Sequence, residues 1–128
     1  MEEHIELNFV YSKDASKVKE FLGNIPRSIE CINYMDIVNK LTKNDYYQFE
    51  PSDAVVSSYL IRQIQIAFER DTLRSLFYVL GSLDEQVINN IKEYVSTLTD
   101  KSITFNLYYS SIPTENYDHL FNDIIEFE

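Results

Sequence analysis

Three polar residues stand where an α/β protein could hold a ligand. Lys13 follows an alternating apolar segment that ends at Tyr11, whereas Ser82 and Asp84 follow the apolar run that ends at Leu80. Ligands of parallel sheets bind beyond the carboxyl ends of the strands, so these loops are candidates for binding a phosphorylated metabolite. Neither GxxxxGK[ST] nor GxGxxG occurs in the chain, although phosphate-binding loops need glycine for close backbone approach. Helix capping is therefore the simpler interpretation of these residues.

Nucleophilic and metal chemistry have little support. Nucleophilic catalysis needs a base beside the nucleophile, yet His4 and His119 neighbour no serine or cysteine motif. The single cysteine, Cys31, lies in an apolar segment and is predicted to be a small core residue. His119 and Asp123 share an i, i+4 spacing, but two ligands make no metal site, and no HExxH, CxxC or EF-hand spacing occurs. We expect no catalysis, no cofactor and no metal.

Two surfaces are stronger candidates, because each could bind another protein. The first is a predicted loop in which aromatic rings stand among acids, as in many interface hot spots: Asp45, Tyr46, Tyr47, Phe49 and Glu50. The second lies after Lys101, where no Lys or Arg follows, and combines a tyrosine on the polar face of the last predicted strand with three acids: Tyr108, Glu115, Asp118 and Asp123. The alternatives are rings that fold back over the core and a solvated acidic helix.

The composition indicates one acidic globular domain. The chain has 128 residues, of which 45% are hydrophobic and 14% aromatic, enough to bury a core without disulfides or metals. No apolar run reaches the roughly 18 residues of a membrane span, the first residues do not resemble a signal peptide, and one cysteine allows no internal disulfide. We expect a single domain, 1–128, in the cytoplasm and away from membranes.

The net charge of −10 restricts the class of partner. Residues 1–64 hold ten acids and seven bases, whereas residues 65–128 hold eleven acids and four bases, so acidity grows along the chain. DNA and RNA are not expected as direct ligands, because few cations are present to contact a phosphate backbone. Such a charge would attract a basic protein, although it could also serve only to keep the surface solvated. The usage of Asn, Ile, Tyr and Lys is similar to that of small proteins from AT-rich genomes, including those of many phages.

Four strands are predicted from the apolar pattern. Apolar and polar residues alternate over 4–11 and 102–109, which is typical of half-buried strands, and the second of these is expected at a sheet edge. Residues 76–80 form a continuous apolar run, as in a central strand covered on both faces. A weaker strand is predicted over 28–34.

Five helices are predicted from caps and from a 3.6-residue period. The first three begin near Ser12 or Asp14, near Asp36, and near Ser52 or Asp53. A capping box with Ser82 as the cap and Glu85 reaching back begins the fourth, whose period is the clearest in the chain. The last is expected to begin at 113–114 and to turn four residues inward: Tyr117, Leu120, Phe121 and Ile124.

This order of elements favours a single three-layer α/β domain with a mostly parallel sheet of about four strands flanked by helices. An α+β domain with a mixed sheet is the alternative. For function, we expect a non-catalytic module of the inhibitor, immunity-protein or regulatory-adaptor type that docks on a basic surface of a partner. Two alternatives remain: a small enzyme or binding domain for a phosphorylated metabolite, and a structural subunit that forms homo-oligomers through the edge strand.

Overall fold

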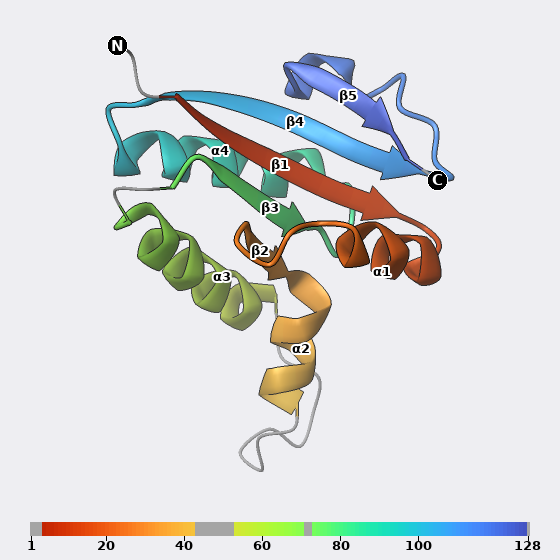
Figure 1. The fold of residues 1–128 in the computed structure, drawn as a ribbon, viewed down its shortest axis with the longest axis horizontal. Helices are drawn as coiled ribbons and strands as arrows, with labels where there is room; N and C mark the ends of the chain where they lie inside the picture. Colours follow the sequence, from red (N-terminus) through yellow and green to blue (C-terminus); the bar gives the residue numbers. More distant parts are fainter. Residues whose placement is uncertain (1–3, 43–52, 71–72, 128) are drawn as a thin grey trace.

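The fold is a five-stranded, all-parallel sheet with helices on both faces (Figure 1). It was obtained as a computed structural model, which describes residues 4–42, 53–70 and 73–127. The strands lie in the order β2-β3-β1-β4-β5, with β1 at the centre, and their bounds are β1 (His4–Ser12), β2 (Glu30–Asn33), β3 (Ser75–Val79), β4 (Ser102–Ser110) and β5 (Asp123–Glu126). The predicted α/β class and the parallel sheet are confirmed.

Four helices connect these strands. They are α1 (Ala15–Gly23), α2 (Tyr34–Thr42), α3 (Asp53–Phe68) and α4 (Glu85–Leu98). The alternation of side chains along the strands divides the core between the two faces. Phe9, Leu76 and Leu107 pack with α2, α3 and α4 in the larger cluster. Val10 and Val79 face α1 in the smaller cluster, so the predicted three layers are present.

The caps of three helices show how the sequence begins them. Asp14 is the cap of α1, as predicted, and its carboxylate accepts a hydrogen bond from the Ser16 amide at 3.0 Å. The cap predicted at Asp36 is wrong, because α2 begins at Tyr34 and the Asn33 side chain accepts from the Met35 amide at 2.9 Å. The fourth helix begins later than its predicted capping box, as described below.

The predicted final helix is the main error in the fold. Instead of a helix, residues 118–120 form a short 3₁₀ turn, η1 (Asp118–Leu120), and the chain then adds strand β5 beside β4. Leu120 and Phe121 are buried as expected, but by the turn rather than by a helical face. Because Asn106 pairs with Asp123 in the ladder, β4 is an inner strand. The exposed edge that the self-assembly hypothesis required is therefore absent from this strand.

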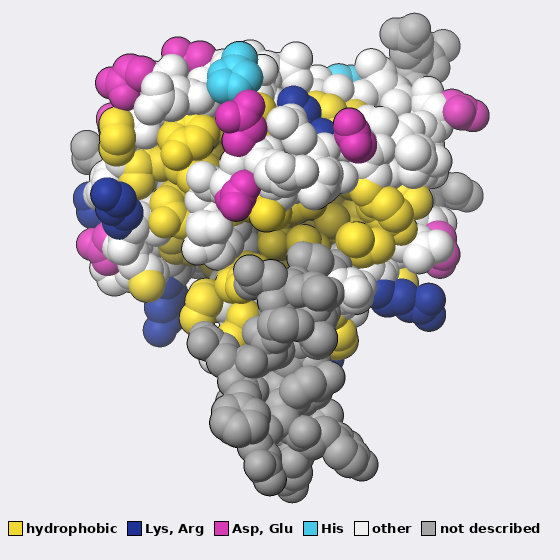
Figure 2. Space-filling view, turned by 180° about the vertical axis from the view of Figure 1, so that it is seen from behind, with side chains coloured by type: hydrophobic (Ala, Val, Ile, Leu, Met, Phe, Trp, Pro, Cys, Tyr) yellow, Lys and Arg dark blue, Asp and Glu magenta, His cyan; other side chains and the backbone are white. Residues whose placement is uncertain are grey.

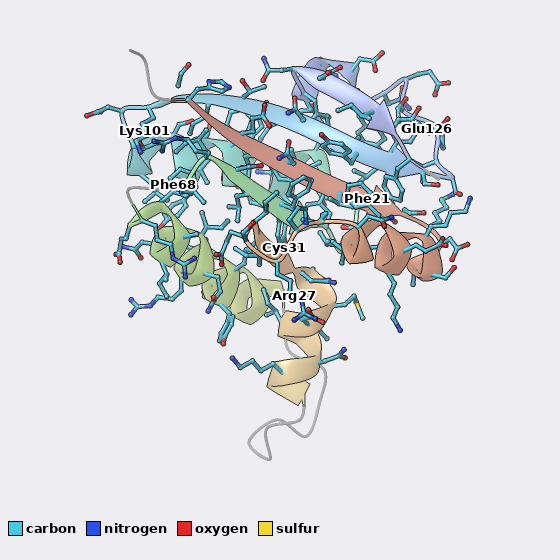
Figure 3. The ribbon with its side chains drawn as sticks, viewed as in Figure 1. Phe21, Arg27, Cys31, Phe68, Lys101 and Glu126 are labelled. Carbon is cyan, nitrogen blue, oxygen red and sulfur yellow. The ribbon has the colours of Figure 1, made fainter. Side chains whose placement is uncertain are left out.

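The helix α1 covers the carboxyl half of its sheet face. Its Phe21 lies between the helix and the sheet (Figure 3), 5.4 Å from the Tyr108 ring and 4.4 Å from the Phe127 ring between centroids. In the other half of this face, buried Asn8 and Asn106 sit side by side on β1 and β4. The Asn106 Nδ2 donates to Asn8 Oδ1 at 3.0 Å. A polar contact thus crosses the centre of the sheet.

Candidate functional site

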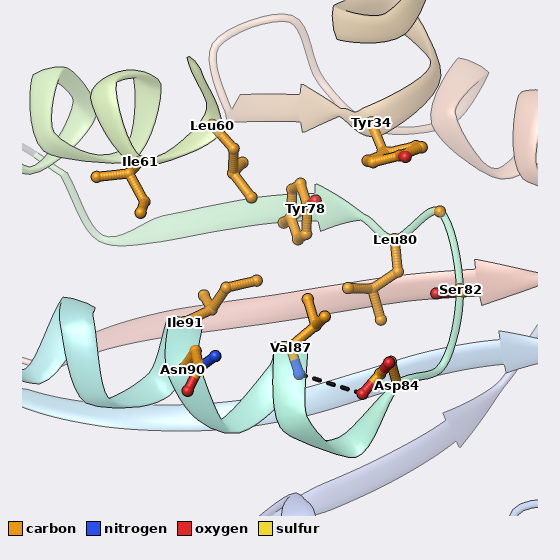
Figure 4. A pocket seen from close by; sticks show the side chains of 11 residues that line it. Tyr34, Leu60, Ile61, Tyr78, Leu80, Ser82, Asp84, Val87, Asn90 and Ile91 are labelled. Atoms are coloured by element: carbon orange, nitrogen blue, oxygen red, sulfur yellow. Dashed lines mark hydrogen bonds between the residues drawn. The ribbon is translucent and has the colours of Figure 1, made fainter. Parts of the chain in front are cut away.

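A pocket of about 240 Å³ lies between α3 and α4, beyond the carboxyl end of β3 (Figure 4). Three consecutive elements build most of it, because α3 leads into β3 and α4 follows β3 on the same face of the sheet. Most of its lining is apolar: Tyr34, Leu60, Ile61, Tyr78, Leu80, Gly81, Ser82, Asp84, Val87, Asn90 and Ile91. Mostly apolar concave sites at strand ends, with a few polar groups, are typical of ligand sites in α/β proteins.

The floor of the pocket is Tyr78, which rises from β3 between the two helices (Figure 4). Its side chain is only 2% exposed and packs edge-on against Phe9, with ring centroids 6.2 Å apart. Burial, and secondarily the neighbouring Tyr34, raises the pKa of Tyr78, so the hydroxyl stays protonated and uncharged.

One wall is formed by Tyr34, the first residue of α2, lying against Gly81. A Cβ atom at position 81 would overlap the Tyr34 ring. Glycine is therefore needed here for space rather than for an unusual backbone angle, because its φ is not positive. This contact fixes the position of an aromatic ring directly beside the loop that follows β3.

The rim of the pocket is apolar and open to solvent. Ile61 of α3 is 36% exposed and Val87 of α4 is 38% exposed. Figure 2 shows the face that carries α3 and α4, with hydrophobic side chains gathered in a band across its middle. We call the pocket together with Ile61 and Val87 the α3–α4 groove. Two other exposed apolar residues, Met35 and Ile66, lie outside its lining.

The structure brings Ser82 and Asp84 together in the pocket, as the carboxyl-end rule suggested. The predicted capping box is wrong, because Asp84 and not Ser82 is the cap of α4. The Asp84 carboxylate accepts from the amides of Gln86 at 2.9 Å and Val87 at 3.4 Å. Glu85 lies instead 2.8 Å from His119. Asp84 is thus occupied by a structural role, which agrees with the simpler interpretation.

Lys13 does not reach this pocket. It is exposed in the turn after β1, and α1, which follows it, packs on the opposite face of the sheet. Lys17, from the first turns of α1, donates to the Ser111 hydroxyl at 3.0 Å. Among the described residues, the lining of the pocket includes one acid and no Lys, Arg or His. The described part of the lining therefore offers no cation to a phosphorylated ligand.

The acids of the C-terminal candidate surface lie on different elements. Glu115, Asp118 and Asp123 are all exposed, but Asp118 lies in the turn that packs on α4, whereas Asp123 aligns with Asn106. Asn106 and Tyr108 alternate onto the face that α1 covers. Tyr108 is half-buried, and its ring packs beside α1 with Phe21 and Phe77. Its role in partner binding stays a prediction.

Two nearby acids affect the pKa of the Tyr108 hydroxyl. Its pKa is raised, first by desolvation and then by the negative charges of Glu6 and Asp123. The other candidate surface, with Asp45, Tyr46, Tyr47, Phe49 and Glu50, lies outside the described residues. Its predicted role in partner binding therefore stays a prediction.

The structure also shows the positions of the cysteine and of His4, which were considered as candidates for nucleophilic chemistry. Cys31 is exposed on β2, so its assignment to the core is wrong. Its thiol pKa is raised by partial desolvation and then by Asp36 and Glu30, which opposes formation of a nucleophilic thiolate. His4 lies 2.6 Å from the Thr104 hydroxyl. Within the described ranges, no three His, Cys, Asp or Glu side chains are grouped to hold a metal.

No helix in the described part of the chain is both long enough and apolar enough to cross a bilayer. Comparison with known protein families, with curated proteins and with solved structures found no match to this chain.

Sequence reasoning missed the residues that form most of the groove. Leu60 and Ile91 have the spacing of ordinary core residues, and Tyr78 lies within an apolar strand, so their types gave no sign of a pocket. One signal was present in α3, where apolar residues such as Ile61 extend beyond the stripe that packing needs. Ile61, one of these additional apolar residues, is exposed at the rim of the pocket.

Proposed function

We propose that this protein is a non-catalytic binding module that receives a basic partner protein in the α3–α4 groove. The observation that carries the proposal is the open apolar groove, whose rim exposes Ile61 and Val87 on one face. Exposed apolar surface of this kind, gathered in one place and next to a pocket, is characteristic of binding sites for other proteins or ligands.

Charge supports a basic partner. The chain carries a net charge of −10, and the residues that the structure describes in the groove lining include Asp84 and no cationic side chain. Complementary charge accelerates encounter, while the desolvated apolar centre of an interface supplies most of the affinity. The same absence of cations disfavours the phosphorylated metabolite considered as an alternative.

The test uses the immobilised full chain to capture partners from a lysate of the source organism at low and high salt. Ile61 and Val87 are replaced together by Gln, and the matched control replaces Met35 and Ile66 by Gln. Both pairs are exposed apolar residues, and neither change alters the net charge. Circular dichroism and thermal unfolding verify that both variants fold.

A stoichiometric basic protein that is released by salt, lost with the groove variant and retained by the control supports the proposal. We expect the groove variant to bind roughly tenfold or more weakly, because truncated interface anchors commonly cost over about 1 kcal/mol each. Equal capture by both variants would place the partner elsewhere and would refute docking in the groove.

A further inference from the structure

The half of the sheet face that α1 leaves uncovered is polar. In Figure 1 no described helix lies in front of the amino-terminal halves of β1 and β4, and α3 and α4 pack on the opposite face. Side chains from four strands alternate onto this area, which we call the polar half-face: Glu6, Asn8, Ser75, Asn106 and Asp123. Although no described helix covers them, Asn8 and Asn106 are only 1% and 6% exposed.

Two aromatic rings explain this burial. Phe77 on β3 and Tyr108 on β4 stand on either side of β1, on strands that are about 9–10 Å apart. Their ring centroids are only 5.6 Å apart, so the rings lean toward each other over β1. Asn8 of β1 is aligned with both Phe77 and Asn106. Tyr108 is only half-buried, so this aromatic cover borders on solvent.

Asn106 ends a chain of hydrogen bonds with an acceptor that lacks a donor. Asn8 Nδ2 donates to Ser75 Oγ at 3.0 Å, and Asn106 Nδ2 donates to Asn8 Oδ1 at 3.0 Å. The remaining atom, Asn106 Oδ1, is buried and has no hydrogen-bond partner in the described part of the chain. Most buried polar groups in native proteins are paired, because an unpaired one costs free energy. A ligand that supplies a hydrogen-bond donor would satisfy this oxygen.

The charges on the polar half-face favour a cationic donor. Asp123 is aligned with Asn106, Glu6 lies two residues before Asn8, and both carboxylates are exposed. Burial raises the pKa of the Tyr108 hydroxyl, and the negative charges of Glu6 and Asp123 raise it further. The fields of both carboxylates thus reach the aromatic cover, where an anion would be repelled. An organic cation would be attracted by the carboxylates and by the aromatic ring.

We propose that the polar half-face binds the primary ammonium group of a small organic amine, which donates a hydrogen bond to Asn106 Oδ1 and is attracted by Glu6 and Asp123. Because Oδ1 is covered in this structure, the Tyr108 ring turns aside as the ammonium group enters. A metal ion fits less well, since the described residues contain no group of three His, Cys, Asp or Glu side chains that could hold one. The site lies on the opposite face from the α3–α4 groove and does not depend on the docking function.

The chemistry of the site is tested by titrating the full chain with three small probes. Propylammonium is a cation with N–H donors, trimethylpropylammonium keeps the charge but has no donor, and butyrate is an anion. NMR follows the side-chain amide of Asn106 and the ring of Tyr108. We expect propylammonium to bind most tightly and to shift both sets of signals. Trimethylpropylammonium should bind roughly threefold or more weakly, because it cannot donate to Oδ1.

Matched variants locate the site. Glu6→Gln and Asp123→Asn each remove one negative charge from the polar half-face, and each should weaken propylammonium binding roughly twofold to fivefold. Glu93→Gln is the control, because Glu93 is exposed on α4, on the opposite face, and its replacement changes the net charge equally. This control should bind propylammonium as the wild-type chain does. Thermal unfolding verifies that all three variants fold.

Four results would overturn the proposal. They are the absence of propylammonium binding, equal or tighter binding of trimethylpropylammonium or butyrate, equal weakening by Glu93→Gln, and binding that leaves the signals of Asn106 and Tyr108 unchanged. A capped Gly-Lys-Gly peptide distinguishes a free amine from a lysine side chain of another protein. If this peptide binds more than tenfold more tightly than propylammonium, the occupant is a protein side chain and the proposed small amine is refuted.

Discussion

The ring of Tyr34 occupies the space beside Gly81 that any side chain at position 81 would fill. The first residue of α2 is in this way packed against the loop that joins β3 to α4. The contact determines the shape of the pocket, because both residues line it.

Replacing Gly81 by Ala should push the Tyr34 ring out of place and lower the free energy of unfolding by about 1–3 kcal/mol, as overpacking does in ordered interiors. Gly23→Ala is the control, since nothing lies within 4 Å of a Cβ at that position in α1. It should leave stability unchanged or raise it slightly. Urea unfolding of both variants measures the difference, and equal stabilities would contradict the described contact.

The cap of α4 gives a second prediction. Asp84→Ala should destabilise the protein by about 1 kcal/mol, because two amides of the first turn lose their acceptor. Asp84→Asn should retain most of the stability, as asparagine also caps helices well. Ser82→Ala should have little effect. A larger loss from Ser82→Ala than from Asp84→Ala would restore the capping box that the sequence suggested.

The asparagine pair in the sheet should behave as one unit. Asn106→Val removes the donor to Asn8 and leaves the buried Asn8 Oδ1 unsatisfied, at a cost of about 1–3 kcal/mol. Changing both residues to Val removes both polar groups, so the double variant should be less destabilised than the sum of the single variants. Additive losses in a double-mutant cycle would show that the two side chains do not interact.

High pH provides a test of the burial of Tyr78. Its folded-state pKa is raised above the ordinary value of 10.0, so above about pH 10 the unfolded chain loses a proton that the folded chain keeps. Stability should therefore fall with rising pH by up to about 1.4 kcal/mol per pH unit from this group. Tyr78→Phe should show a shallower decline between pH 9 and 11. Parallel stability curves would mean that the hydroxyl is accessible to solvent in the folded protein.

Much of the fold could be predicted because its signals are local. The continuous apolar run at residues 76–80 indicated a strand covered on both faces, and the alternation along β1 and β4 indicated their faces. The last segment was misread because Leu120, Phe121 and Ile124 have a spacing that also fits a helix. A short strand that pairs with a distant neighbour is specified by the sheet edge it meets, which no local pattern shows.

The candidate site was predictable only in part. The rule that ligands lie at strand carboxyl ends led to Ser82 and Asp84, and both line the pocket. This rule could not reveal the groove. Leu60 and Ile91 would have the same positions in the sequence pattern if α3 and α4 were packed tightly together, with no pocket between them. The space between α3 and α4 depends on how the two helices sit on the sheet, which is a property of the tertiary structure.

The measurement that tests the central claim most directly is a hydrogen-exchange footprint of the full chain with its purified basic partner. If the partner docks in the α3–α4 groove, we expect the backbone amides to exchange more slowly in the amino-terminal turns of α4, in the middle of α3 and in the loop after β3. Exchange in α1, on the opposite face of the sheet, should not change. Protection confined to α1 or to the edge strand β5, with α3 and α4 unaffected, would contradict the account.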